Sequence, residues 1–272
     1  MLTSQPKSAC RAGRAKPSTN SDRGKTPRLS TLHRENKMIL GYDTETTGLP
    51  LWHEPSDAHS QPHLIQIALL LHDMKGNEVD RLTTIVKPGP GAVMAPEALE
   101  AHGITLERAM DEGMDPSDVV DIFLDWSAKV DLMVGHNESF DRRIMRIAAA
   151  RHKGFKWEPT CPNFCTLYRS KFIMNLPPTA KMIAAGVPGP KSPNLGECIR
   201  HFFNEDLDGA HDAMVDISAS MRVFWHLVRD CGVPMFKSAR SSNAKPRSTR
   251  PATSPGNPFA AAAALLNQAA GE

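Results

Sequence analysis

Cysteine, aromatic residues and long apolar runs are all scarce in this sequence. It has five cysteines in 272 residues, and only 6% of its residues are aromatic. An odd number of cysteines in a chain without an export signal favours reduced thiols over a disulfide framework. No apolar run approaches the ~20 residues of a membrane-spanning helix, and the first residues lack the apolar stretch of a signal peptide. We therefore expect a cytoplasmic protein with no membrane partner.

The two ends of the sequence differ in composition from its middle. Residues 1–37 carry nine Lys and Arg against two acids, are rich in Ser, Thr and Pro, and show no apolar periodicity. Residues 236–272 run from a basic Ser/Pro stretch into an Ala-rich apolar segment. We expect a disordered basic N-terminal segment (1–37), one folded domain (38–235) and a disordered basic, Ala-rich tail (236–272). A native start at Met38, directly before the first strand, is an alternative.

The charge of the chain is unevenly divided. The sequence has 32 Lys and Arg and 30 Asp and Glu, but residues 38–235 hold 18 of these bases and 27 of the acids, so the folded part is acidic by nine charges. An acidic body with basic arms suits nucleic acid, because flexible Lys and Arg screen phosphates while carboxylates gather metal ions. The alternative is that the tails only aid solubility.

The periodicity of apolar residues predicts an α/β fold. Apolar runs at 38–46, 63–73 and 79–88 predict three strands joined as a meander, and 131–137 a short buried strand. Helical patterns occupy residues 95–103, 104–113, 115–130, 138–153, 194–203 and 211–231. Residues 155–193 are irregular apart from a helical stretch at 165–176, and 156–165 is the best candidate for a fifth strand. Together these elements predict a mixed sheet covered by helices.

Two acids stand at the end of the first predicted strand. Residues i and i+2 of a strand point to the same face, so Asp43 and Glu45 lie side by side. Two neighbouring carboxylates repel each other unless something positive lies between them. A divalent cation is the simplest solution, and hard oxygen ligands favour Mg²⁺ or Mn²⁺ over zinc. The pair therefore predicts a metal site that needs further ligands.

A second acid-bearing stretch is VGHNESFDRRIM, residues 134–145. A buried strand ends here and a helix begins. We expect His136 and Asn137 to cap this helix, with Asp141 one turn inside it. Asp141 is therefore a candidate third ligand, although stabilisation of the helix dipole is an ordinary alternative for such an acid.

The third stretch is HDAMVDISAS, residues 211–220. Asp216 lies in the first turns of the last helix, and His211 precedes it by five positions, which is roughly 140° of rotation. The two side chains would not share a helix face, so we expect His211 at or before the helix start, where it could act as a base on a metal-bound water. Asp212 competes with Asp216 as the ligand, because the two share a helix face.

In their order and separations these stretches resemble the DnaQ-like 3′–5′ exonucleases, in the subclass named DEDDh for four acids and a histidine. The resemblance covers about residues 38–228. It is carried by D-x-E-T-T-G at 43–48, LIQIAL at 64–69, AHGIT at 101–105, H-N-x-x-F-D at 136–141 and H-x-x-x-x-D at 211–216. Each motif alone is weak, but together they are specific. The resemblance implies an RNase H-like fold, a five-stranded mixed sheet with helices on both faces.

The resemblance also implies which residues do the chemistry. The catalytic set is Asp43, Glu45, Asp141, His211 and Asp216. The four acids would hold two Mg²⁺ or Mn²⁺ ions, and His211 would accept the proton of the attacking water. The H-x-x-x-x-D spacing favours Asp216 over Asp212. The implied substrate contacts are Thr46, Gly48, Leu49, His102, Asn137 and Phe140.

The implied reaction is removal of nucleoside 5′-monophosphates from the 3′ end of single-stranded DNA, in proofreading or end trimming. An RNA-directed enzyme resembling RNase T or oligoribonuclease is a close alternative, because sugar discrimination depends on pocket shape. A different class of hypothesis is a module that docks on a DNA polymerase or clamp through the C-terminal tail.

The cysteines allow one competing site. Cys161, Cys165, Cys198 and His201 could be drawn as a zinc cage. Zinc cages usually have tighter cysteine spacing, so buried thiols are the preferred interpretation.

Overall fold

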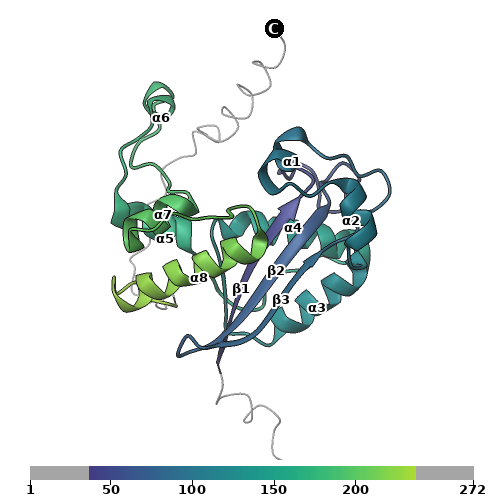
Figure 1. Cartoon of the computed structure of the whole chain (residues 1–272), viewed down its shortest axis with the longest axis horizontal. Helices are drawn as coiled ribbons and strands as arrows, with labels where there is room; N and C mark the ends of the chain where they lie inside the picture. Colours follow the sequence, from purple (N-terminus) through teal and green to yellow (C-terminus); the bar gives the residue numbers. More distant parts are fainter. Residues whose placement is uncertain (1–36, 237–272) are drawn as a thin grey trace, which may run out of the picture. The chain divides into compact units, whose positions relative to one another are not determined.

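The computed structural model describes residues 37–236. Within them, five strands form one mixed sheet in the order β3-β2-β1-β4-β5 (Figure 1). β1 runs antiparallel to β2 and parallel to β4, and β2 and β3 form an antiparallel hairpin. The strands are β1 Met38–Thr46, β2 Leu64–Asp73, β3 Glu78–Ile85, β4 Leu132–Gly135 and β5 Asn163–Cys165.

The helices of the described part cover both faces of this sheet. They are α1 Pro96–His102, α2 Leu106–Glu112, α3 Pro116–Ala128, α4 Glu138–Lys153, α5 Thr166–Met174, α6 Ala180–Ala184, α7 Leu195–Phe203 and α8 Ala213–Arg229. α8 packs on β1, β2 and β4, whereas α4 packs on β1, β4 and β5 and is itself covered by α3. The mixed five-stranded sheet with helices on both faces is the predicted fold.

The alternation of side chains along β1 divides the core into two layers. Leu40 and Tyr42 are buried in the layer formed with α3 and α4. Gly41 faces α8, where a Cβ atom would lie 2.8 Å from the sulfur of Met221. Glycine fits this position because any larger residue would displace the Met221 and Ile217 side chains of α8. Asp43 and Glu45, two and four positions further along, share the α8 face with Gly41.

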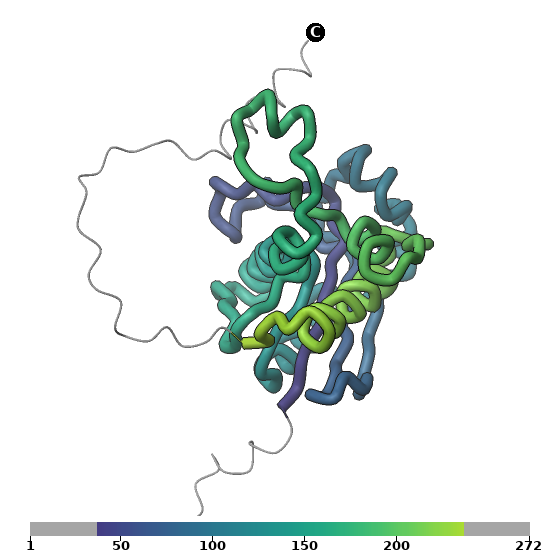
Figure 2. Tube along the Cα trace, turned by 90° about the vertical axis from the view of Figure 1, so that its left-hand side faces the viewer, coloured from purple at the N-terminus to yellow at the C-terminus, as the bar shows by residue number. Residues whose placement is uncertain are grey.

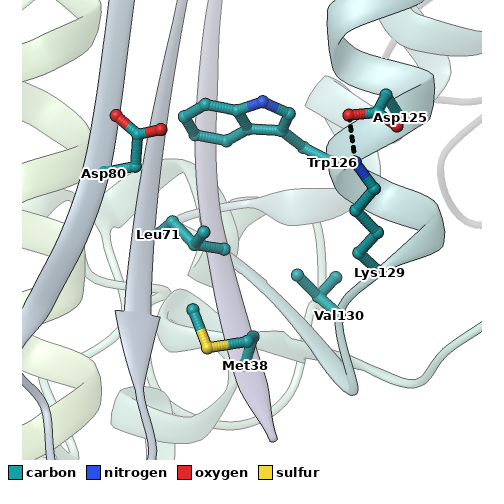
Figure 3. A pocket seen from close by; sticks show the side chains of 7 residues that line it. All are labelled: Met38, Leu71, Asp80, Asp125, Trp126, Lys129 and Val130. Atoms are coloured by element: carbon teal, nitrogen blue, oxygen red, sulfur yellow. Dashed lines mark hydrogen bonds and ion pairs between the residues drawn. The ribbon is translucent and has the colours of Figure 1, made fainter. Parts of the chain in front are cut away.

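A pocket opens at the start of β1, at the opposite end of the strand from its two acids. Met38, Leu71, Trp126 and Val130 supply its apolar walls (Figure 3). Lys129 lies on its rim, where its ammonium group pairs with Asp125 at 2.5 Å. This end of the sheet carries none of the predicted site residues.

The structure agrees with the predicted element order and resolves the irregular region. The fifth strand lies within the predicted candidate, at Asn163–Cys165, and pairs parallel to β4. The short helix α6, inside the Pro-rich stretch, was not predicted. No helix among residues 37–236 is long and apolar enough to cross a membrane.

The predicted tails fall almost wholly outside the described residues. Of 1–37 only residue 37 is described, and of 236–272 only residue 236. Residues 37–233 belong to one compact unit, and a second unit begins at residue 234. Of the second unit, only residues 234–236 are described.

Candidate active site

Asp43 and Glu45 lie at the carboxyl end of β1, both partly buried. The pairing of β1 with β2 shifts register between Glu45 and Thr46, so the strand is irregular where the acids end. Burial and the charges of nearby carboxylates raise the pKa of Asp43 well above its usual range. The same causes raise the pKa of Glu45 to about 9. The carboxylates acting on both residues include Asp216 and Asp212, which come from the other end of the chain.

Asp141 reaches the site from α4, on the other side of β1. It is 3% exposed, and its Oδ1 atom accepts hydrogen bonds from the Thr44 backbone N–H at 3.0 Å and from the Thr44 hydroxyl at 2.8 Å. Burial raises the pKa of Asp141, and the bonds from Thr44 partly oppose that shift. Its charge is also the largest carboxylate influence on Asp43. Thr44 therefore fixes Asp141 beside Asp43, a contact that sequence reasoning missed.

His211 precedes the last helix, as predicted. It adopts a left-handed backbone conformation, with φ of 69°. Its backbone N–H donates to Oδ2 of Asp216 at 3.2 Å. α8 begins at Ala213, so His211 lies outside the helix while Asp216 lies in its first turn. A hydrogen bond thus links the two ends of the H-x-x-x-x-D motif.

Asp212 occupies the N-cap of α8 instead of competing with Asp216. Its Oδ1 atom accepts from the backbone N–H groups of Met214 and Val215 at 3.0 and 3.2 Å. These bonds satisfy N–H groups that have no partner inside the helix. The two candidate acids therefore occupy different environments, and Asp216 is the one whose carboxylate lies beside Glu45 and His211.

Gln66 of β2 holds the start of α8 from the side. Its Oε1 atom accepts from the backbone N–H of Ala213 at 3.1 Å, and its Nε2 group donates to Asp212 at 3.2 Å. Gln66 is 8% exposed. The pair of bonds ties β2 to the turn that carries His211. The LIQIAL stretch contains this residue, but nothing in the sequence indicates its partners.

A buried network supports the first turn of α4. Glu138 is 2% exposed, and its carboxylate accepts from the Tyr42 hydroxyl at 2.7 Å and from the Asn163 amide at 2.8 Å. Arg142 lies 3.5 Å from the same carboxylate. The network joins β1, α4 and β5 next to Asp141. Sequence reasoning missed it, because a buried Glu one turn before the candidate acid Asp141 carries no motif of its own.

The arrangement of the acids fits a divalent cation. Glu45, His211 and Asp216 offer ligand atoms that all lie within 4.8 Å of one another. Oδ1 of Asp216 is buried without a hydrogen-bond partner. Carboxylates with raised pKa values and an unpaired buried oxygen are costly unless a positive charge lies among them. The residues present therefore suit a metal with oxygen ligands.

The residues implied as substrate contacts lie in two groups. In the first, the Thr46 hydroxyl donates to the Gly48 carbonyl at 2.7 Å, and the Nε2 atom of His102 lies 3.1 Å from the Thr46 carbonyl. Because the Ile104 N–H donates to Nδ1 of His102, Nε2 carries the proton of this imidazole. Burial is the main reason that the pKa of His102 is lowered.

Leu49 extends this first group into solvent. Its side chain is 81% exposed, and it borders a hollow between residues 47–49, 59–63 and 91–95. An apolar side chain so exposed, four positions after Glu45 in the sequence, is suited to contact a nucleobase.

The second group surrounds the start of α4. Asn137 is exposed, whereas Phe140 is partly buried against the core layer below α4. Asn137 occupies the predicted N-cap position of α4, with φ of 66°, but its side chain does not make the capping hydrogen bond that this prediction implied. His136 does not cap the helix either. Its ring contacts the Thr166 hydroxyl at 2.9 Å and the Pro193 carbonyl at 3.2 Å.

The cysteines do not form the alternative zinc cage among the described residues. Glu45, His211 and Asp216 are the group of potential metal ligands found between residues 37 and 236. Cys198 is buried with its sulfur 3.7 Å from that of Met174, and burial raises its pKa to about 11. A protonated buried thiol is a packing residue and a poor ligand.

Comparison with known families identifies the family of this chain. Residues 40–224 match the sequence model of the exonuclease family of the RNase T type. The chain belongs to the exonuclease family. The match covers every catalytic residue predicted from the motifs, and it confirms the resemblance to the DnaQ-like exonucleases. No curated protein matches the chain.

Solved structures of exonuclease I share the fold of this exonuclease domain. The E. coli enzyme in complex with a dT13 oligonucleotide has a TM-score of 0.55 and 19% identity, over 71% of this chain and 41% of that one. Exonuclease I from Methylocaldum szegediense has a TM-score of 0.55 and 20% identity, over 72% and 41%. A product-bound exonuclease I has a TM-score of 0.54 and 19% identity, over 73% and 45%. The chain thus spans less than half of the length of these structures.

The contacts of Gln66 lead to a prediction for the exonuclease site. Gln66→Leu removes both bonds that hold the start of α8, so His211 and Asp216 lose their fixed position. We expect kcat to fall by about 10- to 100-fold, the effect typical of residues that orient metal ligands. The measurement is the rate of nucleotide release at saturating substrate, with the circular dichroism spectrum showing that helix content is kept. An unchanged kcat in the folded variant would show that Gln66 does not position the site.

Proposed function

We propose that residues 38–235 are a two-metal 3′–5′ exonuclease that releases nucleoside 5′-monophosphates from the 3′ end of single-stranded DNA. The observation that carries this proposal is the convergence of Asp43, Glu45 and Asp216 with His211, within a chain that matches the exonuclease family over residues 40–224. Four clustered acids and one histidine are the groups that such a hydrolysis needs.

Each catalytic residue has a role in the proposal. Asp43, Glu45 and Asp216 would hold one divalent ion, Mg²⁺ or Mn²⁺, and Asp43 and Asp141 would hold a second. When bound, the ions supply activation of the attacking water and neutralise charge at the leaving 3′ oxygen. His211 would act as the general base, because it lies outside α8 and beside the carboxylates of Glu45 and Asp216.

The terminal nucleotide is placed by the two groups of contacts. Backbone groups of Thr46 and Gly48 bind it, Leu49 packs against its base, and His102 keeps the Thr46 carbonyl in place through its 3.1 Å contact. Asn137 and Phe140 supply contacts from α4. The exposure of Leu49 and Asn137 supports these roles.

Single-stranded DNA is favoured as the substrate because the similar E. coli structures are complexes with dT13 and dA16 oligonucleotides. End trimming or proofreading is the corresponding role. The RNA-directed alternative differs only in the sugar that the pocket accepts, so one experiment distinguishes the two. The alternative partner role through the C-terminal tail concerns residues outside the described part of the chain.

The test is digestion of a 5′-labelled single-stranded DNA and of the matching RNA, with Mg²⁺, Mn²⁺ or EDTA. We expect a ladder shortening from the 3′ end of the DNA, dependent on metal and lost in Asp43→Asn. Faster digestion of the RNA would favour the alternative, an RNA-directed exonuclease. If the folded wild-type chain cleaves neither strand with either metal, the proposal is wrong.

A further inference from the structure

One long stretch of the acidic domain contains no acid. Residues 159–196 carry four bases and neither Asp nor Glu, and within residues 38–235 no other acid-free interval is as long. The bases are Arg169, Lys171, Lys181 and Lys191. The stretch forms β5, α5 and the extension that carries α6. Its charge is therefore opposite to that of the domain it belongs to.

α5 turns two aromatic rings away from the core. Its buried residues, Thr166, Ser170 and Met174, are spaced by four positions along the side that packs on α7 and α8. Tyr168 and Phe172 are offset from that stripe by two positions, roughly 200° around the helix. They are 61% and 64% exposed. An aromatic pair on the solvent side of a helix contributes nothing to the core, so it requires another explanation.

The exposed rings lie beside positive charge. The centroids of Tyr168 and Phe172 are 6.3 Å apart, with the rings nearly perpendicular. The ammonium group of Lys171 lies 5.9 Å from the Phe172 ring. Lys181, in α6, is exposed. A surface with aromatic rings and basic side chains but no acids suits single-stranded nucleic acid. The nucleobases stack on the rings, and the phosphates pair with Lys and Arg.

The extension is attached to the catalytic motif. α6 lies at the tip of a loop that stands away from the body of the domain (Figure 1, Figure 2). The two ends of this segment meet at His136, which contacts Thr166 at the start of α5 and Pro193 at the return. Lys191 N–H also donates to the Leu176 carbonyl at 3.0 Å, closing the base of the loop. The segment is thus anchored one residue before Asn137 of the H-N-x-x-F-D motif.

We propose that Tyr168, Lys171, Phe172 and Lys181, the α5–α6 surface, bind the single strand on the 5′ side of the nucleotide being removed. This inference rests on the proposed function. A strand whose 3′ end lies at the carboxylates must continue over a domain that is otherwise acidic and repels phosphates. The α5–α6 surface offers that strand basic side chains and aromatic rings, and the segment that carries it is anchored at His136, directly before α4.

Direct binding tests the surface without relying on activity. Binding of a fluorescent oligo-dT of about 16 nucleotides, the upper site size of one small binding fold, is measured by anisotropy in EDTA. Tyr168→Ala and Phe172→Ala each remove one stacking face, so we expect Kd to rise by about five- to 100-fold. Both side chains are exposed, and an unchanged Tm verifies that the variants fold.

Salt dependence tests the charged part of the surface. Lys181→Gln should weaken binding and lower the slope of log K against log salt by about one, the change expected for one lost phosphate contact. Lys129→Gln is the matched control, because Lys129 is an exposed lysine at the far end of β1 (Figure 3). It should leave both Kd and the slope unchanged.

Cleavage of a dinucleotide separates this inference from the proposed function. A dinucleotide has a single nucleotide on the 5′ side of the one removed, so we expect it to leave the α5–α6 surface empty. Its kcat/KM should then be unchanged in Phe172→Ala while KM for the long strand rises. Unchanged Kd and KM for the long strand in Tyr168→Ala, Phe172→Ala and Lys181→Gln would overturn the inference even if the domain is active. The α5–α6 surface would then be a candidate site for a protein partner. Loss of wild-type cleavage with retained, variant-sensitive binding would instead overturn only the proposed function.

Discussion

Asp216→Asn is expected to lower kcat by more than about 100-fold, whereas Asp212→Asn lowers it by less than about tenfold. Mutation of a residue that only orients a metal ligand typically lowers activity by about 10- to 100-fold, so loss of a ligand itself should lower it further. Asp216 has a buried oxygen without a hydrogen-bond partner. Its carboxylate lies within 4.8 Å of ligand atoms of Glu45 and His211. Asp212 is the N-cap of α8, and Asn is as good an N-cap as Asp.

The pair of variants separates chemistry from folding. Burial raises the pKa of Asp216, so its ionised form is costly in the metal-free protein and Asp216→Asn should not lower Tm in EDTA. The measurement is kcat at saturating substrate and Mg²⁺, beside thermal unfolding of both variants. If Asp212→Asn lost as much activity as Asp216→Asn, the assignment of the fourth acid would be wrong.

The elements that the sequence predicts well are those that bury a continuous apolar pattern. β1 has its predicted bounds, and α4 has too, because an apolar run ending in acids and a helical stripe ending at glycine are local signals. His211 could be placed before its helix because rotation per residue is fixed. The positions of these residues could therefore be predicted from their spacing in the sequence alone.

The contacts that sequence reasoning missed join residues far apart in the chain. Gln66 and Asp212 are separated by 146 positions, and Thr44 and Asp141 by 97. No periodicity links such pairs, since their contact depends on how the helices cross the sheet. The missing capping bond of Asn137 has a related reason: the residue type does not reveal the left-handed backbone conformation that this N-cap adopts, although Asn tolerates it.

In EDTA, the contribution of Glu45 to the stability of the protein should fall as pH rises from about 5 to about 9. Glu45 has its pKa raised from 4.5 to about 9 on folding, so between these values the folded state binds more protons than the unfolded state. Stability contributed by the protonated group is complete below the unfolded pKa and is lost as pH approaches the folded one. At about 1.4 kcal/mol per unit, this group alone costs on the order of 3 kcal/mol by pH 7.

Divalent metal should reverse this loss, because it binds the ionised carboxylates that protons otherwise neutralise. The increase in Tm on adding Mg²⁺ or Mn²⁺ is therefore expected to be larger at about pH 9 than at about pH 5. Glu45→Gln removes the titrating group, so its Tm in EDTA should depend less on pH and respond less to metal. Glu112→Gln, at an exposed position of α2, is the control that should behave as wild type. If wild-type stability in EDTA instead rises with pH relative to that of Glu45→Gln, Glu45 is paired with positive charge in the absence of metal, which would remove the electrostatic reason for placing a cation there.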